Sequence, residues 1–255
     1  MSKLNYLKPK NKHFIVNDFD FLQKEFYRTY NPDYWLCKIC LLNNCHSNFD
    51  SIKNVLKQNL DNVIDDDYKR SLRTEMHFLY FQMIETLFEI VFAVSKNDNR
   101  NLWINLTFSN WKNNYKEIEK LSDNSYIFTK DNAGISLLRW IFYFVYNSQM
   151  TAEEWVNNLN KIKELLLLFS RDFSDRGEYN AYKHSLRFFN SSFSLSIGAT
   201  NSQNMHTIGS SNDSITYLDE QKEKLPNGKT KATGYISRIT KPFDYERDYI
   251  CCMVI

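Results

Sequence analysis

A regular run of apolar residues between Asp67 and Ser95 constrains the fold more than any other feature of the chain. Successive members of the run are separated by four, three, four, four, three and four residues, which places them on one face of a single long helix. Such a face is stable only when other elements cover it. The sequence therefore predicts a helical bundle that contains this helix. The residues of the run are Leu72, Met76, Leu79, Met83, Leu87, Ile90 and Val94.

Shorter patterns of the same kind predict further helices in the first 190 residues. The clearest start signal is a capping box, with Thr151 followed three residues later by Glu154. The predicted ranges are Asp18–Tyr30, Trp35–Leu42, Ser51–Val63, Leu102–Leu121, Asn132–Tyr146, Ala152–Ser170 and Asp175–Phe189.

Glycine usage changes toward the C-terminus. Five of the six glycines lie at or after Gly177, and glycine is unfavourable inside helices but useful in turns. Phe193, Leu195 and Ile197 alternate with serines, which predicts a half-buried strand. Further strands are predicted at Met205–Gly209, Ser214–Asp219 and Gly234–Thr240, with a turn at Pro226–Gly228.

The predicted fold class is therefore mainly α: a helical bundle with a small antiparallel β-meander near the C-terminus. We divide the chain into a helical bundle (1–190), a β-rich segment packed on it (191–243) and the start of a further or truncated helix (244–255). The total of 255 residues is ample for a core of this kind.

Charge and composition limit the partners and the location. The net charge of +2 favours neither a strongly basic nucleic-acid binder nor an acidic mimic, although a local basic face stays compatible with it. The N-terminus lacks the apolar run of a secretory signal. The apolar stretch Leu79–Val94 contains two glutamates, and Leu137–Tyr146 is shorter than the roughly 20 residues that a membrane span requires. We predict a cytoplasmic protein without a membrane partner, in a reducing compartment that suits five scattered cysteines.

Three cysteines and a histidine, Cys37, Cys40, Cys45 and His46, have the residue types of a zinc site. The Cys37–Cys40 pair lies inside an apolar helical pattern, and no second pair of this spacing completes a tetrahedral set. The favoured interpretation is small buried cysteines on a helix. No metal site and no cofactor are predicted.

The candidate site combines polar residues from two predicted helices. Arg73 and His77 share a face of the long helix, and Glu85 stands in its most apolar part, where a carboxylate is costly unless it is paired or exposed. If the two helices meet, histidine can transfer protons near neutral pH, and arginine or lysine can hold a phosphate or carboxylate. The predicted catalytic residues are His184, Arg176, Asn180 and His77, and the predicted binding residues are Arg73, Glu85, Lys183 and Arg187. Arg176, Asn180, His184 and Arg187 follow one another at steps of four, four and three residues and form one polar stripe on the second helix. In the alternative, this stripe is a solvated surface and Glu85 pairs structurally with Lys183 or Arg187.

The segment from Arg176 through Asn180 to His184 resembles the Arg/Asn…His signature of HEPN-type helical proteins. Seven residues separate Arg176 from His184, more than the four to six usual in that family. The resemblance implies metal-independent cleavage or binding of RNA in bacterial defence or stress. His184 would then be the acid/base, and Arg176 or Arg187 would stabilise a phosphate in transit.

Two hypotheses follow, and the sequence leaves open whether the chain is an enzyme. In the first, the protein is HEPN-like and binds or cleaves RNA. In the second, it is a non-enzymatic interaction or scaffold module that forms a homodimer and presents the β-meander as a recognition surface. Motifs for nucleotide binding and serine hydrolysis do not occur in the chain.

Overall fold

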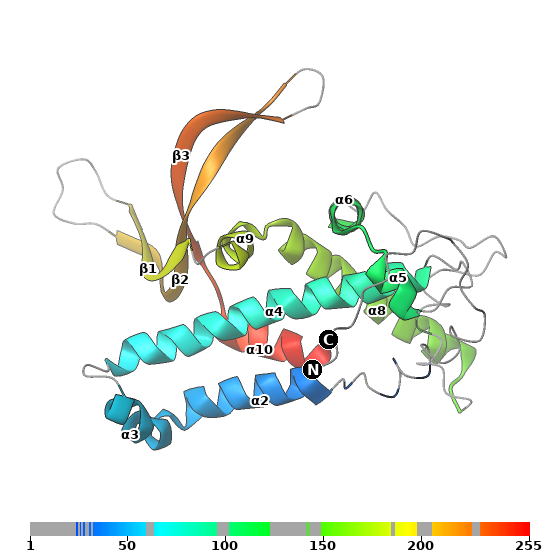
Figure 1. Cartoon of the computed structure of the whole chain (residues 1–255), viewed down its shortest axis with the longest axis horizontal. Coiled ribbons are helices and arrows are strands. Elements are labelled where there is room, and N and C mark those ends of the chain that lie inside the picture. The colour runs from blue at the N-terminus through cyan, green and yellow to red at the C-terminus, as the bar shows by residue number, and fades with distance from the viewer. Residues whose placement is uncertain are drawn as a thin grey trace, which may run out of the picture.

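The computed structural model describes residues 33–59, 64–95, 102–122, 149–184, 187–197, 206–225 and 230–255, together with Lys24, Phe26, Arg28, Asn31 and Phe142. Within these ranges the protein is mainly α-helical, with a three-stranded antiparallel sheet toward the C-terminus (Figure 1). This confirms the predicted fold class. The predicted helices Asp18–Tyr30 and Asn132–Tyr146 fall almost wholly outside the described residues, as does the turn at Pro226–Gly228.

The described helices carry most of the chain before residue 184. Their bounds are α2 (Asp33–Ser47), α3 (Phe49–Asn59), α4 (Asp65–Ser95), α5 (Leu102–Thr107), α6 (Trp111–Ser122), α8 (Ala152–Ser174), α9 (Gly177–Lys183) and α10 (Tyr245–Val254). The predicted capping box at the start of α8 is confirmed, because Thr151 accepts a hydrogen bond from the Glu154 amide and the Glu154 carboxylate accepts one from the Thr151 amide.

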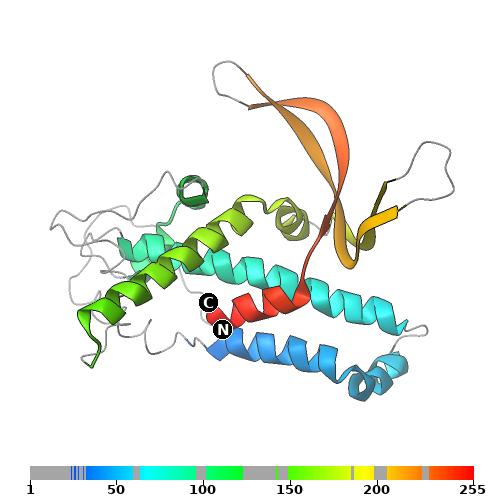
Figure 2. The ribbon, with the colours of Figure 1, turned by 180° about the vertical axis from the view of Figure 1, so that it is seen from behind.

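The long helix α4 is the centre of the core. It contacts α2, α10, α8, α9 and the sheet, so that in Figures 1 and 2 it runs through the middle of the helical body. Its burial goes beyond the predicted face, since Phe78, Phe88 and Phe92 are also buried. Helix α4 is long and apolar enough to cross a membrane, a criterion that the core helix of a soluble protein also meets. In this protein, 56% of its most apolar window is buried.

Two helix predictions were wrong at their boundaries. The range Leu102–Leu121 forms two helices rather than one, because the Asn110 side chain accepts a hydrogen bond from the Asn113 amide and caps a new helix, α6. The helix predicted to reach Phe189 ends at Lys183, and Phe188 instead begins strand β1, where it lies opposite Tyr217. In the second case, pairing with a distant strand overrides a local helical period.

The sheet has the order β1 (Phe188–Ile197), β2 (His206–Lys224) and β3 (Thr230–Pro242). Strand β2 is continuous through the two shorter strands predicted for its range. Ile215 and Tyr217 point into the core, and Gly177 at the start of α9 leaves room for the Tyr217 ring, which a Cβ atom there would strike. The sheet is thereby fixed to the helices at its base.

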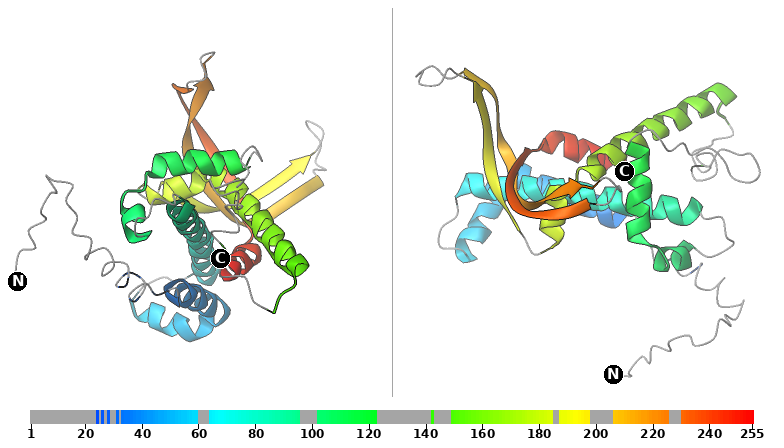
Figure 3. Two further views of the ribbon diagram at one scale, coloured as in Figure 1. Left: turned by 90° about the vertical axis from the view of Figure 1, so that its right-hand side faces the viewer. Right: turned by 90° about the horizontal axis from the view of Figure 1, so that it is seen from above.

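Beyond Tyr217, β2 and β3 continue without β1 as a two-stranded ribbon. Figure 3 shows this ribbon standing away from the helices. Its pairing register shifts between Glu220 and Lys222, and on the facing strand Gly234 has a φ of +77°, a conformation that favours glycine.

Candidate functional site

The two helices of the predicted site do meet. The rings of Phe78 on α4 and Tyr182 on α9 are stacked with their centroids 4.0 Å apart. The Tyr179 hydroxyl of α9 donates a hydrogen bond of 2.8 Å to Glu85 of α4. The polar residues predicted to share one pocket, however, separate into several groups.

Glu85 is the centre of the first group. Lys183 Nζ lies 2.8 and 2.9 Å from its two carboxylate oxygens, and the hydroxyl of Tyr115 donates a further hydrogen bond of 2.6 Å. Burial alone would raise the pKa of Glu85, but the hydrogen bonds from Lys183, Tyr115 and Tyr179 outweigh it and lower the pKa. The alternative in which Glu85 pairs structurally with Lys183 describes this arrangement.

Arg176 and His184 lie at opposite ends of α9, as its N-cap and C-cap residues. Seven helical residues separate them, so their Cα atoms lie roughly 12 Å apart along the axis. The Arg176 guanidinium lies 4.1 Å from the centre of the Tyr115 ring and donates to the Phe173 carbonyl, whereas His184 and Asn180 are exposed. The Arg/Asn…His set therefore does not converge on one point within this chain.

Arg73 forms a separate link between α4 and the sheet. Its Nε donates a hydrogen bond of 2.7 Å to Asp213 on β2, and its Nη1 lies 3.3 Å from His46 Nε2 on α2. Burial, and then the charge of Arg73, lowers the pKa of His46. The Arg73 charge is thus largely neutralised by Asp213.

His77 lies in a buried cluster that joins α4, α9, α10 and β3. Its Nδ1 lies 2.6 Å from Asp248 Oδ2, and its Nε2 lies 3.8 Å from Glu178 Oε1. Lys241 Nζ contacts the other oxygen of Glu178 at 2.9 Å, and the Phe243 ring stacks on the imidazole. Burial alone would lower the pKa of His77, but the hydrogen bond to Asp248 and the negative charges of Asp248 and Glu178 outweigh it and raise the pKa above the ordinary 6.5.

The His77 cluster borders an open cavity of about 740 Å³. Around this cavity Arg247 pairs with Asp172, and Lys241 pairs with both Asp175 and Glu178. Arg247 and Lys241 thus face carboxylates, and this part of the cavity wall is an ion-pair network that ties α10 and β3 to α8 and α9. Arg171 also lines the cavity. Sequence reasoning missed this network, since its members lie far apart in the chain and follow no local spacing.

The stability of the protein is expected to depend on the protonation of His77. Its pKa is higher in the folded state than the ordinary 6.5, so its contribution is fully present below about pH 6.5 and is lost as the pH rises through the folded value. We expect the free energy of unfolding to fall in this window by at most about 1.4 kcal/mol per pH unit. Urea denaturation between about pH 6 and 9 measures this slope, which His77→Gln should lack. An equal slope in both proteins would assign it to another group.

A different surface remains open on the sheet. Three cross-strand pairs place their side chains on the same face of the sheet. These pairs are Phe189 with Thr216, Leu218 with Arg238, and Ile236 with Glu220. Phe189, Leu218 and Ile236 are 54%, 63% and 70% exposed. They line a groove of about 530 Å³, which we call the sheet groove; its lining is Arg187, Phe188, Phe189, Thr216, Tyr217, Leu218, Asp219, Glu220 and Ile236.

Two arginines mark one end of the sheet groove. The Arg238 guanidinium lies 5.6 Å from the centre of the Phe189 ring, and Arg187 Nε donates to the carbonyl of His184. Within the described ranges, no carboxylate lies within ion-pair distance of either guanidinium. Of the predicted site residues, Arg187 lines this groove, and the backbone carbonyl of His184 holds its guanidinium. Phe189 and Arg238 were missed because the sequence placed Phe189 in a helix.

The cysteines of α2 differ from the prediction. Cys37 and Cys40 are exposed rather than buried, and Cys45 is half-buried. The apolar period was correct for the helix, but the thiols lie on its outer side. In the part of the chain that the structure describes, no group of three or more His, Cys, Asp or Glu side chains is placed to hold a metal ion.

Comparison of the chain with protein-family models, curated proteins and solved structures finds no match.

Proposed function

We propose that the protein binds single-stranded RNA across the sheet groove. The observation that carries this proposal is the half-exposed Phe189 ring beneath Arg238, with Arg187 at the same end of the groove and neither guanidinium held by a described carboxylate. Unstacked bases bind proteins by stacking on aromatic rings and arginine planes, and a sheet surface is a common platform for this contact.

The groove supplies the contacts that a single strand needs. Phe189 offers a face for one base, while Leu218 and Ile236 extend the apolar floor along the ribbon. Arg187 and Arg238 are placed for phosphate oxygens, which arginine binds with paired N–H groups. Asp219 and Glu220 also line the groove and can accept hydrogen bonds from base amino groups or from a ribose 2′-hydroxyl.

The proposal concerns binding and leaves cleavage out. A metal-free phosphodiester cleavage needs an acid, a base and a cation around one phosphate. Arg187 lines the groove and His184 ends α9 nearby in the chain, but Arg176 is held at the other end of α9 against Tyr115. In the His77 cluster, His77 pairs with Asp248 and Lys241 pairs with Glu178.

Substitution of Phe189 tests the stacking contact. We expect Phe189→Ala to weaken binding of a fluorescent 12-nucleotide single-stranded RNA about tenfold, because one stacked base contributes about 1–3 kcal/mol. Fluorescence anisotropy at a fixed salt concentration gives the affinity. The chain offers a matched control in Trp111, which is also half-exposed and has Lys112 Nζ 5.4 Å from its ring centre. Trp111→Ala should leave RNA binding unchanged.

Substitution of Arg238 tests the phosphate contact separately. Removing one phosphate contact from a single strand should reduce the slope of log K against log salt concentration by about 0.7. We expect this reduction for Arg238→Gln and none for Lys112→Gln. The measurement is the same anisotropy titration, repeated over a series of salt concentrations.

Three results would overturn the proposal: no binding of RNA, no preference for single-stranded over duplex RNA, or equal losses of affinity in Phe189→Ala and Trp111→Ala. If RNA binding failed while light scattering showed self-association that Leu218→Glu abolished, the groove would belong to the alternative, a non-enzymatic interaction module.

A further inference from the structure

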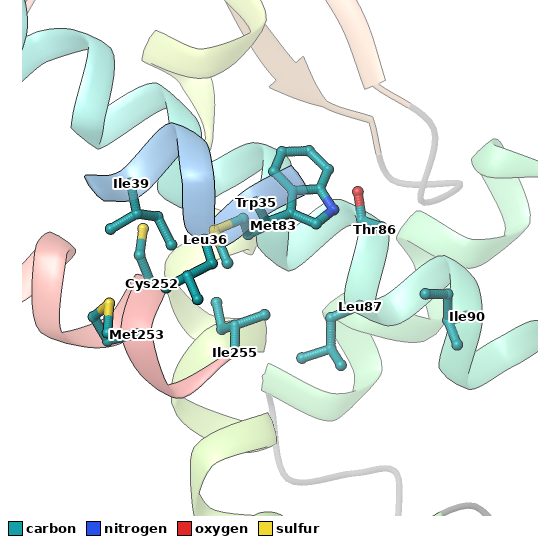
Figure 4. Close-up of a pocket in the computed structure, with 10 residues that line it drawn as sticks. All are labelled: Trp35, Leu36, Ile39, Met83, Thr86, Leu87, Ile90, Cys252, Met253 and Ile255. Carbon is teal, nitrogen blue, oxygen red and sulfur yellow. The ribbon is translucent and has the colours of Figure 1, made fainter. Parts of the chain in front are cut away.

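Helix α2 has two apolar faces, and the core uses one of them. Trp35 and Ile39 point toward α4 and α10, where they line an apolar cavity of about 230 Å³ (Figure 4). The face on the other side carries Tyr34, Cys37 and Leu41, at positions i, i+3 and i+7 of the helix. Tyr34 and Leu41 are 55% and 63% exposed, and Cys37 is exposed between them. The outer face of α2 therefore presents apolar surface to solvent.

The second exposed thiol, Cys40, follows Cys37 by three residues on the same outer face. Side chains at this spacing are neighbours, with Cβ atoms about 5–6 Å apart. A tetrahedral zinc ion with Zn–S bonds of about 2.3 Å requires sulfur atoms about 3.8 Å apart, which this spacing allows by rotation about the Cα–Cβ bonds. Cys37 and Cys40 can thus supply two of the four ligands of a structural zinc site.

The remaining ligands are missing from the described part of the chain. His46 belongs to the same sequence motif and is of a suitable type. Its Nε2, however, lies 3.3 Å from Nη1 of Arg73, the arginine that links α4 to the sheet. No described group of three ligand side chains surrounds either cysteine. The site is half of a tetrahedral set, and a second copy of the same helix would supply the same half again.

We infer that Cys37 and Cys40 of two copies of this chain bind one Zn²⁺ between their α2 helices and so form a two-fold symmetric dimer. A two-fold axis through the metal makes the interface self-complementary, as homodimer interfaces are. The pairing would also bury the exposed Tyr34 and Leu41 of both copies. The site and the dimer depend on each other, because neither chain alone completes the coordination.

The binding step is a ligand exchange without oxidation or reduction. Four thiols each lose a proton, four Zn–S bonds form, and the water ligands of the ion are released, so each dimer releases four protons. The resulting centre carries a net charge of −2. Lys38, next to Cys37 and held over the rings of Tyr34 and Trp35, brings one positive charge per chain to its surroundings.

The test uses the full chain, freed of metal and kept reduced, to which zinc chloride is added. We expect the mass from light scattering to double with one zinc bound per two chains, and two protons released per chain. Cobalt(II) in place of zinc should give the thiolate-to-metal absorption of a tetrahedral sulfur site. Cys37→Ser and Cys40→Ser should each weaken zinc binding at least about 100-fold and abolish the zinc-dependent dimer. Loss of a hydrogen-bond partner of a ligand already lowers metal affinity by about 10–100-fold, and loss of the ligand itself should lower it more.

Cys45→Ser is the matched control, because Cys45 lies on the same helix and should leave both zinc binding and dimerisation unchanged. Three results would overturn the inference: a monomer that binds zinc, a dimer that persists after the metal is removed, or zinc binding that survives in Cys37→Ser and Cys40→Ser. Both thiols are exposed, so serine at either position should leave the fold intact, which circular dichroism checks.

Discussion

Replacement of His77 by alanine is expected to lower the free energy of unfolding by about 3–5 kcal/mol, the cost of breaking a buried ion pair from one side. The partner left behind is Asp248, which is 1% exposed; its Oδ1 accepts no hydrogen bond from the described residues and has only Arg247 Nη1, at 3.6 Å, within ion-pair distance among them. Glu178 is less affected because Lys241 still pairs with it. Urea denaturation followed by circular dichroism at pH 6 gives the value.

The matched control is His184→Ala, since His184 is exposed and its loss should change stability by less than about 0.5 kcal/mol. A second variant separates the ion pair from packing. If the charges cause the loss, His77→Leu combined with Asp248→Leu should recover most of it, because an apolar pair of similar size replaces a buried ion pair at little cost. A double variant as unstable as His77→Ala would show that the shape of the imidazole matters more than its charge.

Replacement of Phe81 by alanine is expected to cost about 3–5 kcal/mol, as for other fully buried rings. Phe81 is 3% exposed and stacks on Tyr179 of α9 at 5.4 Å between centroids. The Phe81 and His77 rings are nearly perpendicular with their centroids 5.1 Å apart, so the Phe81 ring supports both the α4–α9 packing and the buried histidine.

Phe108→Ala is the control for this second prediction, because Phe108 is 60% exposed and should lose less than about 0.5 kcal/mol. The Phe81 and His77 substitutions should not be additive, since the two side chains touch. A loss below about 1 kcal/mol for Phe81→Ala would mean that the rings around it close the cavity.

The parts of the fold that sequence predicted are those fixed by neighbours in the chain. The period of α4 and the Thr151–Glu154 capping box are local, and both appear in the structure. The helix predicted through Phe189 failed because Phe188 pairs with Tyr217, almost thirty residues later in the chain. A helical period in a short segment carries no information about such a partner.

In the candidate site, too, the contacts signalled by local sequence were predicted and those with distant residues were not. The cost of a carboxylate in apolar surroundings pointed to a partner for Glu85, and Lys183 is one of the two that were considered. Asp248 could not be found in this way, because it meets His77 across 171 positions of the sequence. The two sides of α2 were likewise indistinguishable from the sequence, so Cys37 and Cys40 were expected in the core although both are exposed.

The position of α10 sets the order in which the protein can be completed during synthesis. Asp248 follows His77 by 171 residues, so at about 5–20 residues per second the ribosome delivers it roughly 10 to 35 s after the histidine. Throughout that interval the side of α4 that α10 covers, including Met83 and the imidazole itself, has no native cover. The face of α4 that α10 covers therefore stays open for many seconds during synthesis, far longer than the microseconds in which helices and hairpins form.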